Sequence, residues 1–124
     1  MRIYISLPIS GRPSQESRNQ ADNVKTYISK LGHTPVSPFD IYAGKNPTYA
    51  DHITCDLRAM MDCDAVVFLP GWQFSTGCCI ERQVATLMLE NPSTFGREFF
   101  RIYERPGFIP RLDIKKTDLD PNAF

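Results

Sequence analysis

Three residues that are far apart in the sequence have side chains suited to nucleophilic and acid–base chemistry: Glu81, Asp56 and Tyr4. An ionised carboxylate can attack an electrophilic carbon, while a second carboxyl group supplies or takes a proton. A tyrosine hydroxyl can orient the nucleophile by donating a hydrogen bond to it. Two acids and a tyrosine in one pocket would suit glycosyl chemistry, so the question is whether the fold brings them together.

The segment that carries Glu81 is predicted to be a strand, a loop and a helix. Residues 65–69 (AVVFL) form an unbroken apolar run, which is typical of a strand buried on both faces of a parallel sheet. Pro70-Gly71-Trp72 ends the strand, and the side-chain oxygen of Ser75 can cap the helix that follows. We expect that helix to bury Ile80, Val84, Leu87 and Met88. Ligands bind in the loops that follow the carboxyl ends of parallel strands, so we expect a site here.

Asp56 lies in a second predicted helix, residues 48–63, on the same face as Ile53, Leu57 and Met60. A buried carboxylate costs free energy unless it is paired or lines a cavity. It could be a buried cap or an ion-pair partner. We favour a functional role, because this helix carries the acid toward the ends of the strands.

The remaining elements complete an alternating pattern of strands and helices. Residues 3–7 predict a central strand, and residues 13–31 predict a helix that is closed by Gly32 and buries one face, made of Ala21, Val24, Tyr27, Ile28 and Leu31. Two more strands, 33–37 and 98–103, are expected at the edges of the sheet. Between the first of these and the second helix, a loop over 39–47 could wall the site, with Tyr42 either stacked on a planar ligand or simply packed.

This pattern predicts one three-layer α/β domain over residues 1–104, followed by a tail over 105–124. We expect a flavodoxin-like, mainly parallel sheet of about five strands in the order 2-1-3-4-5. In that order the strands that begin near Ile3 and Ala65 are neighbours. Their exit loops would then face each other across one crevice.

Composition limits the possible partners. Lys plus Arg and Asp plus Glu number 14 each, so the net charge is zero and favours a small-molecule ligand over nucleic acid or an anionic membrane. The chain has no apolar run long enough for a membrane span and no amino-terminal pattern of a signal peptide, so we expect a cytoplasmic protein. The cysteines match no metal-binding pattern and are interpreted as small buried apolar groups: Cys55, Cys63, Cys78 and Cys79. We expect neither a metal nor another cofactor.

Four short segments, in this order, resemble the nucleoside 2-deoxyribosyltransferase superfamily: residues 3–8 (IYIxxP), Asp56-Leu57, residues 63–67 (CDAVV) and Ser75-x-Gly77-x-x-x-Glu81. The resemblance spans roughly residues 1–90. Within the superfamily, the chain is similar to small phage and bacterial domains with a Leu-Pro-Gly-Trp-x-x-Ser-x-Gly signature, here Leu69 to Gly77.

The resemblance implies a role for each matching residue. Glu81 would be the nucleophile of a covalent deoxyribosyl intermediate, Asp56 the second acid near the leaving base, and Tyr4 the hydrogen-bond donor to the nucleophile. Ser75 falls where the transferases have an Asp for the sugar 5′-hydroxyl and where the related deoxynucleoside monophosphate glycosidases have a Ser for the phosphate. Leu7-Pro8-Ile9 replaces much of the glycine-rich loop of those glycosidases. The expected substrate-binding residues are Ser6, Pro8, Ser10, Gly11, Arg12, Gly71, Trp72, Ser75 and Gly77.

The resemblance thus implies an N-glycosidase or deoxyribosyltransferase acting on a 2′-deoxynucleoside or its 5′-monophosphate, assembled as a homodimer or a larger homo-oligomer. The alternative is a non-catalytic module of the same fold that binds or senses a nucleotide-derived ligand, held by Trp72 and Arg12. A nucleic-acid-binding accessory role is disfavoured by the neutral charge balance.

Overall fold

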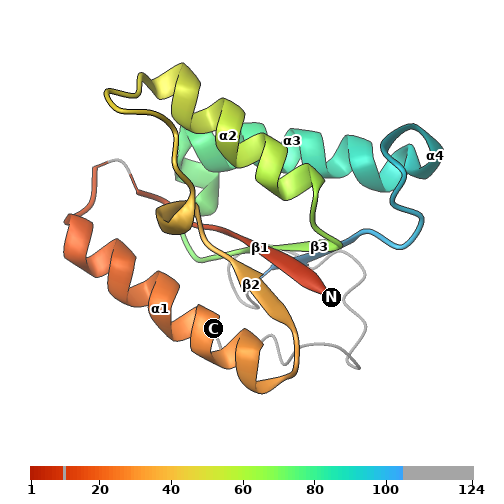
Figure 1. Cartoon of the computed structure of the whole chain (residues 1–124), viewed down its shortest axis with the longest axis horizontal. Coiled ribbons are helices and arrows are strands. Elements are labelled where there is room, and N and C mark those ends of the chain that lie inside the picture. Colours follow the sequence, from red (N-terminus) through yellow and green to blue (C-terminus); the bar gives the residue numbers. More distant parts are fainter. Residues whose placement is uncertain (10, 105–124) are drawn as a thin grey trace.

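The computed structural model describes residues 1–9 and 11–104, so Ser10 and the predicted tail lie outside the described residues. Four strands form one parallel sheet in the order β2-β1-β3-β4 (Figure 1): β1 (Arg2–Ser6), β2 (Thr34–Val36), β3 (Ala65–Phe68) and β4 (Arg101–Glu104). The flavodoxin-like order is confirmed, with β1 and β3 side by side in the middle. The described part of the chain has one strand fewer than the five expected.

Helices cover both faces of the sheet (Figure 1). Helix α1 (Ser14–Lys30) lies on one face, and α2 (Tyr49–Met61) and α3 (Thr76–Glu90) lie together on the other. A short helix, α4 (Pro92–Phe95), follows α3 and leads toward β4. Two 3-10 turns, η1 (Pro38–Asp40) and η2 (Trp72–Phe74), follow β2 and β3. In the described residues, no helix is both long and apolar enough to cross a bilayer.

Strand alternation divides the core into two clusters. Ile3 and Ile5 of β1 pack with the buried face of α1, whereas Tyr4 points to the opposite face, among residues of α2 and α3. Ser6 follows at the next position on the same face as Tyr4 and is fully buried. β1 therefore presents the hydroxyl groups of Tyr4 and Ser6 to the α3 side.

Caps set where the two site helices begin. The Thr48 side chain accepts from the Asp51 backbone N–H at 3.1 Å, and the Asp51 carboxylate accepts from the Thr48 N–H at 2.9 Å, which makes a capping box at the start of α2. The Ser75 side chain accepts from the backbone N–H of Cys78 at 3.3 Å and caps α3, as the sequence predicted. These caps fix the position of Asp56 and Glu81 along their helices.

The buried face of α3 differs from the prediction. It consists of Cys78, Glu81, Ala85 and Met88, while Leu87 is 51% exposed. Met88 is buried as expected and Ile80 and Val84 are half-buried, so the prediction was wrong for Leu87. The expected apolar stripe also left out Glu81, which is 5% exposed. Leu31 is also exposed, since α1 ends at Lys30, just before it. All four cysteines are free thiols, and Cys63 and Cys78 are fully buried whereas Cys55 and Cys79 are half-buried.

A buried ion pair joins the last strand to α3. Arg82 donates from Nη2 to Oε1 of Glu104 at 2.8 Å and from Nε to the same oxygen at 2.9 Å, and Glu104 is only 2% exposed. The guanidinium also lies over the rings of Phe68 and Trp72, at 5.6 and 5.8 Å from their centroids. This pairing anchors the far edge of the sheet to the helix that carries Glu81.

Candidate active site

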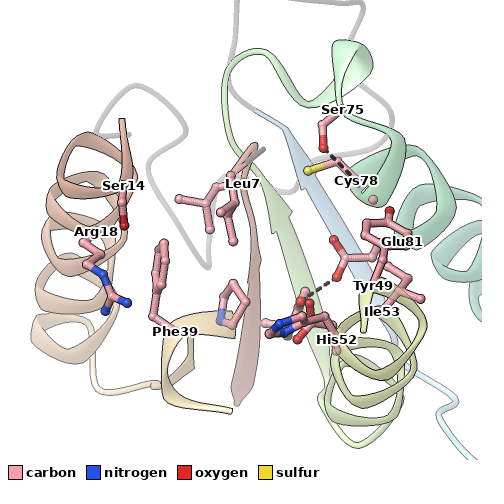
Figure 2. Close-up of a pocket in the computed structure, with 15 residues that line it drawn as sticks. Leu7, Ser14, Arg18, Phe39, Tyr49, His52, Ile53, Ser75, Cys78 and Glu81 are labelled. Atoms are coloured by element: carbon pink, nitrogen blue, oxygen red, sulfur yellow. Dashed lines mark hydrogen bonds between the residues drawn. The ribbon is translucent and has the colours of Figure 1, made fainter. Parts of the chain in front are cut away.

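Glu81 is held by two hydroxyl donors from β1. The Tyr4 hydroxyl donates to Oε2 at 2.5 Å, and the Ser6 hydroxyl donates to Oε1 at 2.9 Å. Figure 2 shows the Glu81 carboxyl group reaching from α3 toward the cavity. Each carboxyl oxygen thus has its own donor, which fixes the orientation of the group. Two donors and no acceptor favour the ionised form of the acid.

Burial opposes ionisation of the same group. Desolvation raises the pKa of Glu81 to about 7, the hydrogen bonds from Tyr4 and Ser6 lower it, and the charge of Asp56 raises it. Burial and the nearby Glu81 charge raise the pKa of Tyr4 well above its usual value of 10.0, so the tyrosine remains a donor. Near neutral pH both protonation states of Glu81 are therefore populated.

Asp56 lines the same cavity from α2. Burial raises its pKa to about 6, and His52, one turn earlier in the helix, lowers it. Within the described residues, no hydrogen bond or ion pair holds its carboxyl group. The acid is therefore placed in the cavity with both oxygens available to a ligand. This agrees with the prediction that Asp56 lies on the inward face of its helix.

The cavity has a volume of about 420 Å³, within the usual range for small-molecule sites. It lies at the carboxyl end of β1, between α1 on one side and α2 and α3 on the other (Figure 2). Its apolar wall is made of Leu7, Ile9, Pro38, Phe39 and Ile53. Its polar groups belong to Tyr4, Ser14, Arg18, Tyr49, His52, Asp56, Ser75, Cys78 and Glu81. Within the described chain, no group of three or more His, Cys, Asp or Glu residues could hold a metal ion.

Several of the expected site residues meet in this cavity. Tyr4, Asp56, Ser75, Gly77 and Glu81 line it, and Ser6 touches it through its hydrogen bond to Glu81. At Gly77, a Cβ atom would lie 3.3 Å from the hydroxyl of Tyr49, so the glycine permits close approach of α2 to the start of α3. The strand-exit loops of β1 and β3 therefore face each other as predicted.

Other expected residues line a neighbouring hollow of about 390 Å³, which meets the cavity at Ser75. Pro8, Arg12 and Gly71 lie there, and Arg12 donates to the Pro8 carbonyl at 3.2 Å and pairs with Glu16 at 3.3 Å. The side chain of Arg12 is 24% exposed.

Three expected residues line neither space, and a fourth is outside the described chain. Gly11 is exposed to solvent, and Trp72 packs against Phe68 with ring centroids 5.3 Å apart. Tyr42, for which ligand stacking and simple packing were both left open, is 81% exposed and away from both spaces, and the aromatic wall of the cavity is Phe39 of η1. Ser10 lies outside the described residues.

Sequence reasoning missed the α1 side of the cavity. Ser14 and Arg18 are one helical turn apart at the start of α1, and this i, i+4 spacing predicts that they share one face of the helix. His52 precedes Asp56 by four residues, so it shares the inward direction already inferred for the acid. Nothing in the local sequence distinguished Phe39 from Tyr42, since both are in one irregular segment.

Comparison with known proteins gives one family and one fold. A family described as a domain of unknown function, DUF4406, matches residues 1–90. No curated protein matches the chain. Among solved structures, a 2-deoxyribosyltransferase from the psychrotolerant bacterium Bacillus psychrosaccharolyticus is similar with a TM-score of 0.55 and 17% sequence identity, over 90% of this chain and 77% of that chain. At this identity the similarity shows a shared fold.

Proposed function

Since the chain belongs to the DUF4406 family, whose description names no activity, we propose a function from the chemistry of the cavity. We propose that the protein cleaves or exchanges the N-glycosidic bond of a 2′-deoxynucleoside or its 5′-monophosphate. The observation that carries this proposal is the carboxyl group of Glu81, oriented by Tyr4 and Ser6 and facing the cavity that Asp56 also lines. The deoxyribosyltransferase fold of the structural neighbour supports the same reaction class.

The proposed reaction has two displacement steps at the anomeric carbon. In the first, ionised Glu81 forms a bond to C1′ as the bond from C1′ to the base nitrogen breaks, and the base leaves with the bonding electron pair. Asp56 in its protonated form donates a proton to the departing base. In the second, water or an acceptor base attacks C1′ and releases Glu81, and Asp56 takes back a proton from the attacking group. The sugar configuration is retained overall.

The two acids have different environments. Glu81 receives two hydrogen bonds, which stabilise its negative charge, whereas Asp56 receives none in the described part of the chain. Burial raises the pKa of Glu81 to about 7 and that of Asp56 to about 6, so the proposed reaction uses a minority protonation state, in which Glu81 is ionised and Asp56 is protonated. Tyr4 would weaken its hydrogen bond as charge leaves Glu81 for the sugar and strengthen it again as the acid is released. The strength of the hydrogen bond between Tyr4 and Glu81 therefore changes in each of the two displacement steps.

The shared boundary at Ser75 supports a 5′-monophosphate as the substrate form. The resemblance implies that Ser75, at the start of α3, holds the 5′ group of the substrate, and Ser75 lines both the cavity and the neighbouring hollow. That hollow contains a cation, Arg12, which suits a phosphate. A 2′-deoxynucleoside without the phosphate would leave it empty.

A binding role without catalysis is the second candidate, and one observation favours it. Burial raises the pKa of Glu81 to about 7, so near neutral pH the neutral acid is also populated, and this form can hydrogen-bond a sugar hydroxyl but attacks poorly. A ligand that raised the pKa further would be held without being cleaved.

The decisive experiment is chromatography of free base after incubation with a panel of 2′-deoxynucleosides and their 5′-monophosphates, with and without an acceptor base. We expect base release by the wild type and none by Glu81→Gln. The control is Glu90→Gln, an exposed acid at the end of the same helix, which should behave as the wild type does. Equal release by wild type and Glu81→Gln would refute the assignment, and saturable binding without release would support the binding role.

A further inference from the structure

The two ends of the cavity differ in chemistry. Figure 2 shows Glu81 and Ser75 on the α3 side, Arg18 and Ser14 on α1 at the opposite side, and Leu7 and Phe39 between them. If C1′ lies at Glu81, which is the premise taken from the proposed function, the base occupies the space over Leu7 and Phe39 and its outer edge faces α1. A flat, largely apolar wall suits the faces of a heteroaromatic ring.

Arg18 is the group that this outer edge would meet. Its guanidinium carbon lies 4.6 Å from the centroid of the Phe39 ring. Within the described residues, this ring is the one partner of Arg18, since no carboxylate or carbonyl accepts from it. A guanidinium stacked on an aromatic ring keeps its N–H donors at its edge, where a ligand in the same plane can use them.

A substrate phosphate is not expected to bind at the Arg18 end of the cavity, because the neighbouring hollow at the other end suits it better. A 5′-phosphate would lie beyond Ser75, where Arg12 is located, and Ser75 is across the cavity from Arg18 (Figure 2). The group that reaches Arg18 is therefore on the base. A guanidinium only donates hydrogen bonds, so it selects an edge with acceptors and penalises an edge with an amino group.

We propose that Arg18, oriented by Phe39, is a specificity-determining residue that selects bases with an exocyclic carbonyl over their amino counterparts. A 6-oxopurine presents O6 and N7 together, which matches two donors of a guanidinium, whereas adenine presents N7 beside an amino donor. Likewise, uracil has a carbonyl oxygen at position 4, where cytosine has an amino group. The preference is for hypoxanthine over adenine and for uracil over cytosine, pairs that are nearly identical in size.

The test compares matched substrates in wild type, Arg18→Met and Arg58→Met. Arg18→Met keeps the length and apolar character of the stem but removes every donor. Arg58, with its side chain 81% exposed on α2, is the control for loss of an arginine. Base release is measured as kcat/KM with the 5′-monophosphates of 2′-deoxyinosine, 2′-deoxyadenosine, 2′-deoxyuridine and 2′-deoxycytidine.

We expect the wild type and Arg58→Met to prefer the oxo member of each pair by about ten-fold, the size of one charged hydrogen bond at a partly exposed site. Arg18→Met should bring both ratios close to one, mainly through slower turnover of the oxo substrates. Phe39→Leu should weaken binding of all four substrates while keeping part of the preference, because it removes the stacking surface. A wild-type ratio near one, or an unchanged ratio in Arg18→Met, would overturn the proposal.

Binding to Glu81→Gln separates this inference from the proposed function. Calorimetric titration with 2′-deoxyinosine and 2′-deoxyadenosine 5′-monophosphates, with and without Arg18→Met in the same chain, measures the preference without any turnover. An oxo preference in binding that depends on Arg18, together with no base release by the wild type, supports Arg18 and refutes the enzymatic role. Base release without an Arg18-dependent ratio refutes Arg18 alone, and the absence of both binding and release overturns both.

Discussion

Replacing Glu81 by glutamine should make the protein more stable, and the gain should grow with pH. Glu81 is 5% exposed, and burial raises its pKa from 4.5 to about 7. Between these values the folded state binds more protons than the unfolded state, so the free energy of unfolding falls as pH rises. Glutamine has no charge to desolvate, and its amide can still accept from Tyr4 while its amino group faces Ser6.

The magnitude follows from the pKa difference. At 1.36 kcal/mol per unit, the buried acid costs the wild type roughly 3 kcal/mol at pH 8, where it is ionised in both states, and roughly 1 kcal/mol at pH 5. The stabilisation of Glu81→Gln should therefore increase by about 2 kcal/mol from pH 5 to pH 8. Urea unfolding at several pH values measures it, provided that both proteins unfold in one transition with equal slopes.

Glu90→Gln is the matched control, because it makes the same chemical change at an exposed position of α3 and should shift stability little at either pH. A Glu81→Gln stabilisation that is constant with pH would refute the reasoning, since it would mean that Glu81 titrates alike in the folded and unfolded chains. A stabilisation that shrinks as pH rises would mean that the hydroxyl donors outweigh burial and that the pKa is lowered.

Three further predictions concern the same site and its support. Asp56→Asn should abolish base release while circular dichroism stays close to wild type, because the acid has no hydrogen bond or ion pair in the described residues; above pH 6 the variant should be at least as stable as wild type, since burial raises the pKa of Asp56 to about 6, and activity above a tenth of wild type would exclude it as the proton donor. Tyr4→Phe should cost about 1.5–3 kcal/mol of transition-state stabilisation, the size of one hydrogen bond to a charged group. Loss of this donor raises the pKa of Glu81, so the acid limb of the pH–rate profile should move to higher pH. An unmoved limb would mean that the Tyr4 hydrogen bond does not set the pKa of Glu81. Arg82→Met should destabilise the fold by about 3–5 kcal/mol in denaturant unfolding, because it leaves Glu104 buried without its partner, and the double variant with Glu104→Gln should recover much of the loss.

The sequence was sufficient for the architecture because the architecture depends on patterns that are local. The unbroken apolar run at 65–69 predicted a fully buried strand, and the strand order followed from the alternation of elements. The caps at Thr48 and Ser75 were also local, and Ser75 was predicted from its side chain and position alone. The two acids could be placed near the ends of the strands because the periodicity of a segment predicts which way its side chains point as well as whether it is a helix or a strand.

What could not be predicted depends on which side chains of different elements meet. Apolarity indicated only part of the inner face of α3, because Glu81 on that face is stabilised by hydroxyl donors from a strand that is more than seventy residues earlier. The choice of Phe39 over Tyr42 depends on where η1 packs against α1, and no local pattern encodes that. Arg18 was not noticed for the same reason, since an arginine on an exposed helix is ordinarily a solvated charge.

Because both donors to Glu81 come from alternate positions of one strand, the site also reports the register of the sheet. A slip of β1 by one residue against β3 would turn Ile5 toward α3 in place of Tyr4 and Ser6, and the carboxyl group would face only hydrocarbon. Misregistered or swapped forms of the chain would keep their secondary structure but lose the hydroxyl pair. Correct pairing of the two central strands thus supplies the two hydrogen bonds that offset part of the desolvation of Glu81, and a chain with the wrong register would bear the full cost.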